Sequence, residues 1–164
     1  QRIISLGVEK VAISSAAIET SELIENASSK VGSQSVVVVI DVKKSDFLKK
    51  YEVVTMNASR RTGKHPSILA EKFEKLGAGE IVLNSVDRDG SQQGYDFELI
   101  DSVRNTISIP LTVLGGAGTL EDVRNLFARY GIIGAAAGSL FVFKGKYRAV
   151  LISYPNREER AAIY

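Results

Sequence analysis

Two glycine-rich segments could bind a phosphate group. Gly115 and Gly116 follow the apolar run that ends at Leu114, and Gly138 and Ser139 follow the next apolar run. Neighbouring parallel strands that end in glycine present backbone N–H groups that no side chain covers, and these groups can hold an anion together with nearby helix N-termini. In a β/α barrel, the loops after the last two strands commonly form such a site. The segments therefore predict a phosphorylated small-molecule substrate.

One acidic residue directly follows the most apolar run of the chain. Asp41 comes after residues 36–40, Val-Val-Val-Val-Ile, whose unbroken β-branched pattern predicts a parallel strand covered on both faces. A carboxylate at the carboxyl end of such a strand lies at the rim of a cleft, where it can act as a general acid or base. The alternative is a loop acid that caps the next turn.

Other predicted strand ends also carry polar groups. Ser14 and Ser15 precede a small-residue run, so one serine could cap a helix while the second hydroxyl binds phosphate. Asn84 ends another apolar run, and residues 87–90, Asp-Arg-Asp-Gly, follow it. That segment is typical of a tight turn, although its Gly90 N–H could also face an anion.

The strands that place these ends alternate with helical patterns. We expect strands at residues 10–14, 36–41, 80–84, 111–114 and 132–136. Helices are expected after Thr20 or Ser21, from Pro66 to Gly77, over 97–103 and after Thr119. Residues 51–57 are expected to form a hairpin outside the sheet, and the chain after Lys144 one or two helical pieces.

This order predicts an α/β fold with a parallel sheet of about five βα units. Both an open doubly wound sheet and part of an eight-stranded barrel agree with it. Nothing divides the 164 residues, so we expect a single domain over residues 1–164.

Composition excludes several classes of partner. The formal net charge of +2 is too small to indicate nucleic-acid binding, and no apolar stretch approaches the roughly 20 residues of a membrane helix. There is no cysteine, which is compatible with the cytoplasmic location that we expect. The only histidine, His65, precedes Pro66 and is expected to lie in the loop before a helix. No residues have metal-ligand spacing, so we expect no metal and no cofactor.

Eight short segments match the motifs of one known family. They are residues 7–11 (GVEKV), 32–34 (GSQ), 39–43 (VIDVK), 77–81 (GAGEI), 87–91 (DRDGS), 94–96 (GYD), 115–118 (GGAG) and 139–141 (SLF). Read in order, they resemble the cyclase subunit of imidazole glycerol phosphate synthase, of the histidine-biosynthesis barrel family. The resemblance covers essentially the whole chain and implies a (β/α)8 TIM barrel, of which this chain is the C-terminal portion with about the last five βα units.

The resemblance also implies an activity. The family cyclises a bis-phosphorylated ribulosyl imidazole precursor with ammonia that a glutaminase partner delivers through the barrel. Asp41 matches the second of the family's two catalytic aspartates, and the first has no counterpart here. Lys10 and Glu80 match the ammonia gate at the partner-facing end.

Substrate-binding residues are implied by the same resemblance. Gly116, Gly138 and Ser139 match one phosphate site, beside Gly115, and Ser14 and Ser15 match the other. Asn84 lies among the substrate-facing residues. The loop that closes over the substrate is implied to contain Asp89, Gly90 and Ser91.

Several positions depart from the family pattern. Leu114 stands where the family has serine, and Ser14-Ser15 where it has Asn-Thr. Such changes favour a paralogue that channels ammonia for sugar amidination, or a non-catalytic conduit, as alternatives. A related sugar-phosphate isomerase is a further alternative, against which the Lys10 and Glu80 matches count. Five strands cannot close an eight-stranded barrel, so we expect either self-association through the open edge or a chain that is part of a larger protein. Because the first catalytic aspartate has no counterpart, the isolated chain is not expected to turn over efficiently.

Overall fold

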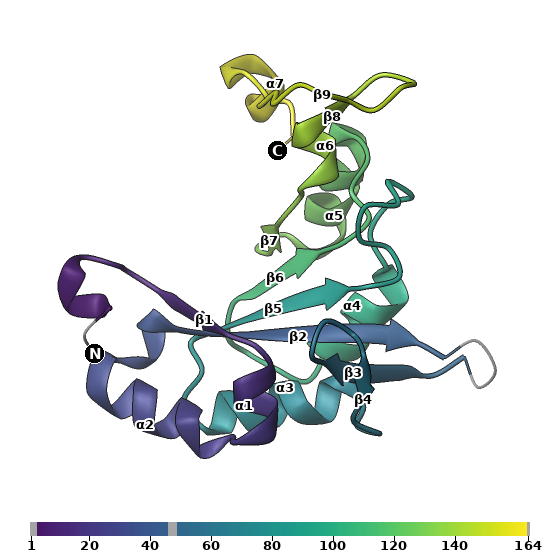
Figure 1. The fold of residues 1–164 in the computed structure, drawn as a ribbon. Coiled ribbons are helices and arrows are strands. Elements are labelled where there is room, and N and C mark those ends of the chain that lie inside the picture. Colours follow the sequence, from purple (N-terminus) through teal and green to yellow (C-terminus); the bar gives the residue numbers. More distant parts are fainter. Residues whose placement is uncertain (1–2, 46–48, 164) are drawn as a thin grey trace.

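The computed structural model describes residues 3–45 and 49–163 and contains a twisted sheet whose parallel strands follow one another in chain order (Figure 1). These strands are β1 (Val11–Ile13), β2 (Val36–Lys44), β5 (Glu80–Ser85), β6 (Leu111–Leu114) and β7 (Gly134–Ala135). Each pairs in parallel with the next, from β1 to β7. Sequential parallel pairing with intervening helices is the pattern of a β/α barrel. The prediction of an α/β partial barrel is confirmed.

Helices connect the strands at the expected places. They are α1 (Ser15–Glu19), α2 (Glu22–Val31), α3 (Pro66–Lys75), α4 (Phe97–Arg104), α5 (Leu120–Tyr130), α6 (Ser139–Val142) and α7 (Arg157–Ala161), with short 3-10 turns η1 (Ile4–Leu6) and η2 (Ser33–Ser35). Pro66 occupies the first turn of α3, and the His65 side chain accepts a hydrogen bond from Ser67 N there. The expected loop role of His65 before a helix is therefore confirmed.

The two faces of the sheet differ in burial. Val38, Ile40 and Leu83 point outward toward the helices and are 0–1% exposed. Val39 and Val82, which point to the inner face, are half-buried. The prediction that residues 36–40 are covered on both faces is therefore wrong at Val39, because helices pack only on the outer face of this open barrel.

Two further predictions need correction. Residues 51–57 contribute β3 (Tyr51–Thr55) to a hairpin with β4 (Arg60–Arg61), but β3 also joins the sheet by antiparallel pairing with residues 41–44 of β2. After residue 142 the chain forms a second hairpin, β8 (Phe143–Lys144) and β9 (Ala149–Val150), before the expected helical piece α7. Local pattern missed β8 and β9 because each has only two residues.

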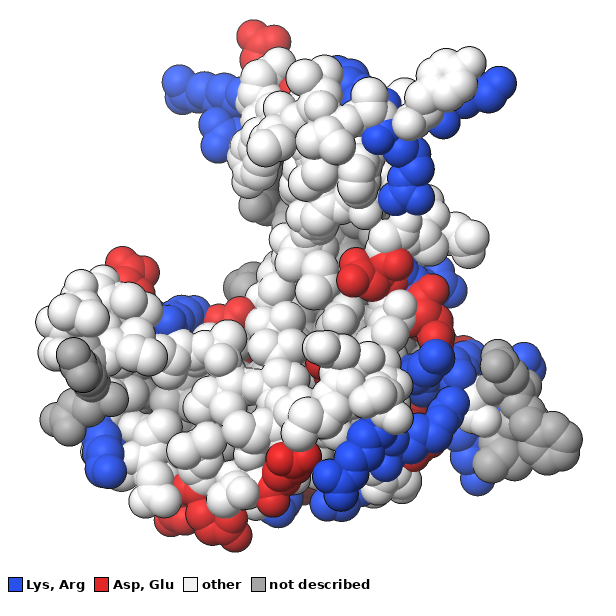
Figure 2. All heavy atoms as spheres, viewed as in Figure 1, with Lys and Arg blue, Asp and Glu red and all other residues white. Residues whose placement is uncertain are grey.

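Charged side chains lie mainly round the margins of the molecule. Figure 2 shows Lys, Arg, Asp and Glu mostly near the edges of the view, including the C-terminal segment at the top. The atoms in the middle of the face drawn are mostly uncharged. None of the helices in residues 3–45 and 49–163 is long and apolar enough to cross a membrane.

Candidate functional site

Asp41 lies on the inner face near the carboxyl end of β2, between two hydrogen-bond donors. Ser14 Oγ, at the end of β1, donates to Asp41 Oδ2 at 3.3 Å, and Asn84 Nδ2 of β5 donates to Asp41 Oδ1 at 2.8 Å. Asp41 and Asn84 are direct neighbours in the parallel register of β2 and β5. The two flanking strands therefore fix both oxygens of a half-buried carboxylate, which leaves it oriented toward the inner face.

The two predicted phosphate-binding serines are engaged in different ways. Ser14 occupies the N-cap position of α1, but its side chain makes no capping bond, because its hydroxyl turns to Asp41 instead. Ser15 Oγ accepts a hydrogen bond from Met56 N at 3.1 Å, which ties the β3–β4 turn to the start of α1. Ser14 therefore stands at the expected helix start, but its hydroxyl makes no capping hydrogen bond and donates to the Asp41 carboxylate.

A second polar group lies at the opposite end of the strands. Lys10 Nζ lies 2.6 Å from Glu80 Oε2, and Thr112 Oγ1 donates to Glu80 Oε1 at 2.7 Å. Burial alone would raise the pKa of Glu80, but the hydrogen bonds from Lys10 and Thr112 outweigh it and hold the pKa below its ordinary value. Glu80 and Asn84 share one face of β5, four residues or about 13 Å apart. The inner face thus has one polar cluster at each end.

Glycine at the end of β6 is required by close packing. A Cβ on Gly115 would lie 2.5 Å from Ser85 O, and one on Gly116 would lie 2.1 Å from Gly94 O. Both glycines are buried and have positive φ, at +99° and +107°. Gly94 N also donates to Gly116 O at 2.8 Å. The loop after β5 therefore packs directly on these two glycines. This packing alone explains why both positions are glycine.

The end of β7 is open by contrast. A Cβ on Gly138 would meet nothing within 4 Å, and Gly138 is exposed. Ser139 lies beside the β5 loop, because a Cβ on Gly90 would be 3.7 Å from Ser139 Oγ. Gly90 and Ser139 thus lie close together at one end of the sheet, next to the uncovered Gly138.

Helix α5 begins between these two glycine segments and caps itself. Thr119 and Asp122 form a capping box, and Asp122 Oδ2 accepts from the backbone N–H groups of Gly118 and Thr119. The Asp122 carboxylate therefore occupies this helix N-terminus, although nearby helix N-termini were expected to help hold an anion. A phosphate at this edge must rely on strand-end groups instead.

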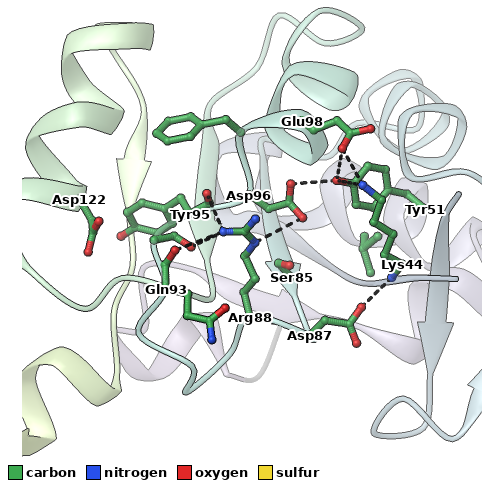
Figure 3. Close-up of a pocket in the computed structure, with 13 residues that line it drawn as sticks. Lys44, Tyr51, Ser85, Asp87, Arg88, Gln93, Tyr95, Asp96, Glu98 and Asp122 are labelled. Atoms are coloured by element: carbon green, nitrogen blue, oxygen red, sulfur yellow. Dashed lines mark hydrogen bonds and ion pairs between the residues drawn. The ribbon is translucent and has the colours of Figure 1, made fainter. Parts of the chain in front are cut away.

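Arg88 binds other residues of the predicted substrate loop, the loop that follows β5. Its Nη1 donates to Gly94 O at 3.0 Å and Tyr95 O at 3.3 Å, and its Nε lies 3.7 Å from Asp96 Oδ2 (Figure 3). Asp89 is exposed, and Ser91 is half-buried with its Oγ 3.4 Å from Gln93 N. The arginine thus stabilises the loop conformation from within.

A cavity of about 540 Å³ lies behind this loop, outside the sheet. Figure 3 shows its polar lining, in which Tyr51 O–H donates to Asp96 Oδ1 at 2.8 Å and Lys44 Nζ lies 2.6 Å from Glu98 Oε2. Burial, and then the hydrogen bond to Asp96, raise the pKa of Tyr51. These contacts join β2 and β3 to the start of α4. They therefore support the end of the loop that follows β5.

Sequence reasoning missed several of these residues. Thr112 could have been found, since it is two residues before Leu114 and therefore on the same face of β6. No local signal marks Tyr51 and Asp96 as partners, because 45 residues separate them.

Comparisons with known proteins identify related sequences. The family model described as histidine biosynthesis protein matches residues 1–148. A protein of Leptospira borgpetersenii named "Putative imidazole glycerol phosphate synthase subunit HisF" is 52% identical over 163 residues, 99% of this chain and 64% of that protein. A Vibrio vulnificus protein, "Putative imidazole glycerol phosphate synthase subunit hisF3", is 46% identical over 98% of this chain and 62% of its own length.

A third relative is the imidazole glycerol phosphate synthase subunit HisF of Lactococcus lactis subsp. cremoris, 40% identical over 141 residues. That match covers 86% of this chain and 54% of the Lactococcus protein. The chain therefore spans less than two thirds of the length of these curated relatives.

Proposed function

This chain belongs to the histidine biosynthesis protein family, and from that premise we propose that it is part of the cyclase barrel of an imidazole glycerol phosphate synthase. The observation that carries the proposal is the position of Asp41. Its carboxylate is held on the inner face by Ser14 and Asn84, at the carboxyl ends of the strands, where β/α barrels place their chemistry.

The proposed reaction joins ammonia to a bis-phosphorylated ribulosyl imidazole precursor. It closes an imidazole ring and releases imidazole glycerol phosphate, an aminoimidazole carboxamide ribotide and one molecule of water. Asp41 accepts and returns protons as the new C–N bonds form and the precursor is cleaved. Such transfers need a carboxylate that reaches the substrate, and the two hydrogen bonds fix its orientation.

The two phosphates of the precursor are proposed to bind at separate strand ends. One lies against Gly116, Gly138 and Ser139, with Gly90 above it, and the other against Ser14 and Ser15. The open space at Gly138 supports the first site. The Ser15 hydroxyl proton remains available to an anion, since that oxygen acts as the acceptor toward Met56 N.

Ammonia is proposed to enter at the Lys10, Glu80 and Thr112 end from a glutaminase subunit. The half-buried Val39 and Val82 lie on the inner face between this end and Asp41. Neutral ammonia can pass apolar side chains, whereas a paired lysine and carboxylate form a polar entrance. The polar cluster at Glu80 supports this direction of travel.

The test is ammonium-dependent turnover of the bis-phosphorylated precursor. Because the family's first catalytic aspartate has no counterpart here, the chain is fused behind the N-terminal part of its Leptospira borgpetersenii relative. Asp41→Asn should lower turnover by roughly 10²–10⁴-fold with little change in substrate affinity. Asp101→Asn, which removes a carboxylate from the outer helix α4, is the matched control. Full activity in Asp41→Asn would overturn the proposed role.

A second candidate function is the channelling of ammonia to a sugar derivative. Leu114 favours it, because this half-buried apolar side chain lies beside Asn84 on the inner face, where the family pattern has a hydroxyl. A folded fusion that binds phosphate but never cyclises the imidazole precursor would favour this candidate.

A further inference from the structure

The C-terminal hairpin β8–β9 reaches back to the loop that follows β5. Arg148, in the turn of this hairpin, donates from Nη2 to Gly90 O at 3.3 Å across 58 residues of sequence. The guanidinium also lies over the Phe143 ring, 4.9 Å from its centroid. Two separate contacts therefore fix the orientation of the Arg148 side chain, although the residue is exposed.

That orientation brings a positive charge to the open end of β7. Gly90, which accepts from Arg148, is the residue whose Cβ would lie 3.7 Å from Ser139 Oγ, next to the uncovered Gly138. A guanidinium has five N–H donors in a planar fork, and Gly90 O takes one of them. The remaining donors suit the oxygens of a phosphate.

Two other cations near this loop already face carboxylates. Arg88 lies 3.7 Å from Asp96, and Lys43 lies 4.0 Å from Asp87. The groups that line the open end, the Ser139 hydroxyl and the backbone of Gly138 and Gly90, carry no net charge. A phosphate dianion held there by uncharged groups would be bound more tightly with a cation beside it, and Arg148 is placed to supply one.

We propose that Arg148 binds the phosphate group at the Gly138 and Ser139 end, so that the hairpin β8–β9 is a substrate-recognition element. The inference rests on the proposed phosphate site and adds to it the charged residue that the family resemblance did not imply. Arg148 is the last residue that the family model matches, and strand β9 follows it directly.

The test is a binding titration of the 164-residue chain, followed by the amide signals of Gly90, Gly138 and Ser139 in NMR spectra. The probes are glycerol 3-phosphate and, separately, inorganic phosphate, which shows whether the free anion suffices or the carbon chain also binds. Arg148→Gln should weaken Kd for the tighter probe by roughly tenfold or more, because a charged hydrogen bond is lost. Arg148→Lys keeps the charge without the planar fork, so its Kd should lie between those of the wild type and Arg148→Gln.

Lys146→Gln is the matched control, because it removes the same charge from the same exposed turn. It should change Kd less than twofold. Arg148→Gln should also reduce the dependence of Kd on salt, which loss of a purely structural contact to Gly90 would not do.

Two results would overturn the inference, and they can be told apart. If Ser139→Ala weakens binding while Arg148→Gln does not, the phosphate site stands and the role of Arg148 is wrong. If neither probe binds the wild-type chain, the proposed phosphate site itself fails, and the inference fails with it.

Discussion

The outer and inner faces of this sheet are built from alternating residues of the same strands, yet they serve different purposes. On the outer face, Val38, Ile40 and Leu83 are 0–1% exposed and pack beneath the helices. On the inner face, Asp41 and Asn84 hold a hydrogen-bonded polar cluster. Because side chains alternate along a strand, a barrel strand can stabilise the fold and carry chemistry at neighbouring positions.

The difference shows where stability resides in this chain. Apolar burial against α2 to α5 is the main stabilising contribution on the outer face. On the inner face, Val39 and Val82 are only half-buried beside the polar groups, although Val37 is buried. A substitution should therefore affect folding or function according to the face on which it lies. The following three predictions test that division.

The largest effect is expected where backbone packs on backbone at the end of β6. Gly116→Ala should destabilise the protein by about 3 kcal/mol or more, because its Cβ would lie 2.1 Å from Gly94 O at a positive φ. Gly138→Ala, at the open end of β7, should change stability by roughly 0.5 kcal/mol or less. Urea unfolding measures both. Equal losses in the two variants would show that the two strand ends do not differ as described.

A matched pair of valines compares the two faces directly. Val38→Ala removes a fully buried outer side chain and should cost about 2–3 kcal/mol of unfolding free energy. Val39→Ala, its half-buried inner neighbour, should cost about 1 kcal/mol or less. Urea unfolding again gives the comparison. A large loss in Val39→Ala would mean that something covers the inner face in solution, and its dependence on protein concentration would identify a second copy.

The smallest effect is expected at the polar cluster around Glu80. Its lowered pKa means that the carboxylate stabilises the folded chain above its ordinary pKa, and that this contribution is lost as pH falls through the lower folded value. Glu80→Gln should therefore cost about 1 kcal/mol or less near pH 7 and nothing in strong acid.

The measurement for Glu80→Gln is the unfolding free energy of variant and wild type between about pH 7 and pH 3. Glu22→Gln, at an exposed position at the start of α2, is the control. A loss that is the same at both pH values would show that Glu80 acts through packing and not through its charge.

Much of the fold followed from local pattern. The apolar runs predicted β5 and β6 almost to the residue, and Thr119 with acidic residues after it predicted the capped start of α5. Short, weakly apolar strands were harder, and β7 covers only two of the five residues expected, 134 and 135. Pairing of β3 with β2 could not be read from the sequence, because strand partners depend on the chain path and not on local composition.

For the site, the sequence predicted which polar residues stand at the strand ends, but it did not predict which groups they contact. The structure keeps Ser14 at the helix start that the sequence predicted, but its hydroxyl donates to Asp41 and does not cap the helix. The sequence also indicated nearby helix N-termini in general as partners of an anion, whereas Asp122 occupies the N-terminus of α5. In both cases a nearby carboxylate competes for the donor, and the competitor is visible only once the chain is folded.

The sequence by itself determined which segments become strands and helices and which polar residues stand at their ends, because apolar periodicity and capping act over a few residues. Only the tertiary structure decided the partners of those polar groups. The contacts of Asp41 with Ser14 and Asn84, of Lys10 with Glu80 and of Arg148 with Gly90 join residues 27 to 70 positions apart. Such contacts depend on strand register and on the curvature of the sheet, which no local segment of the chain specifies.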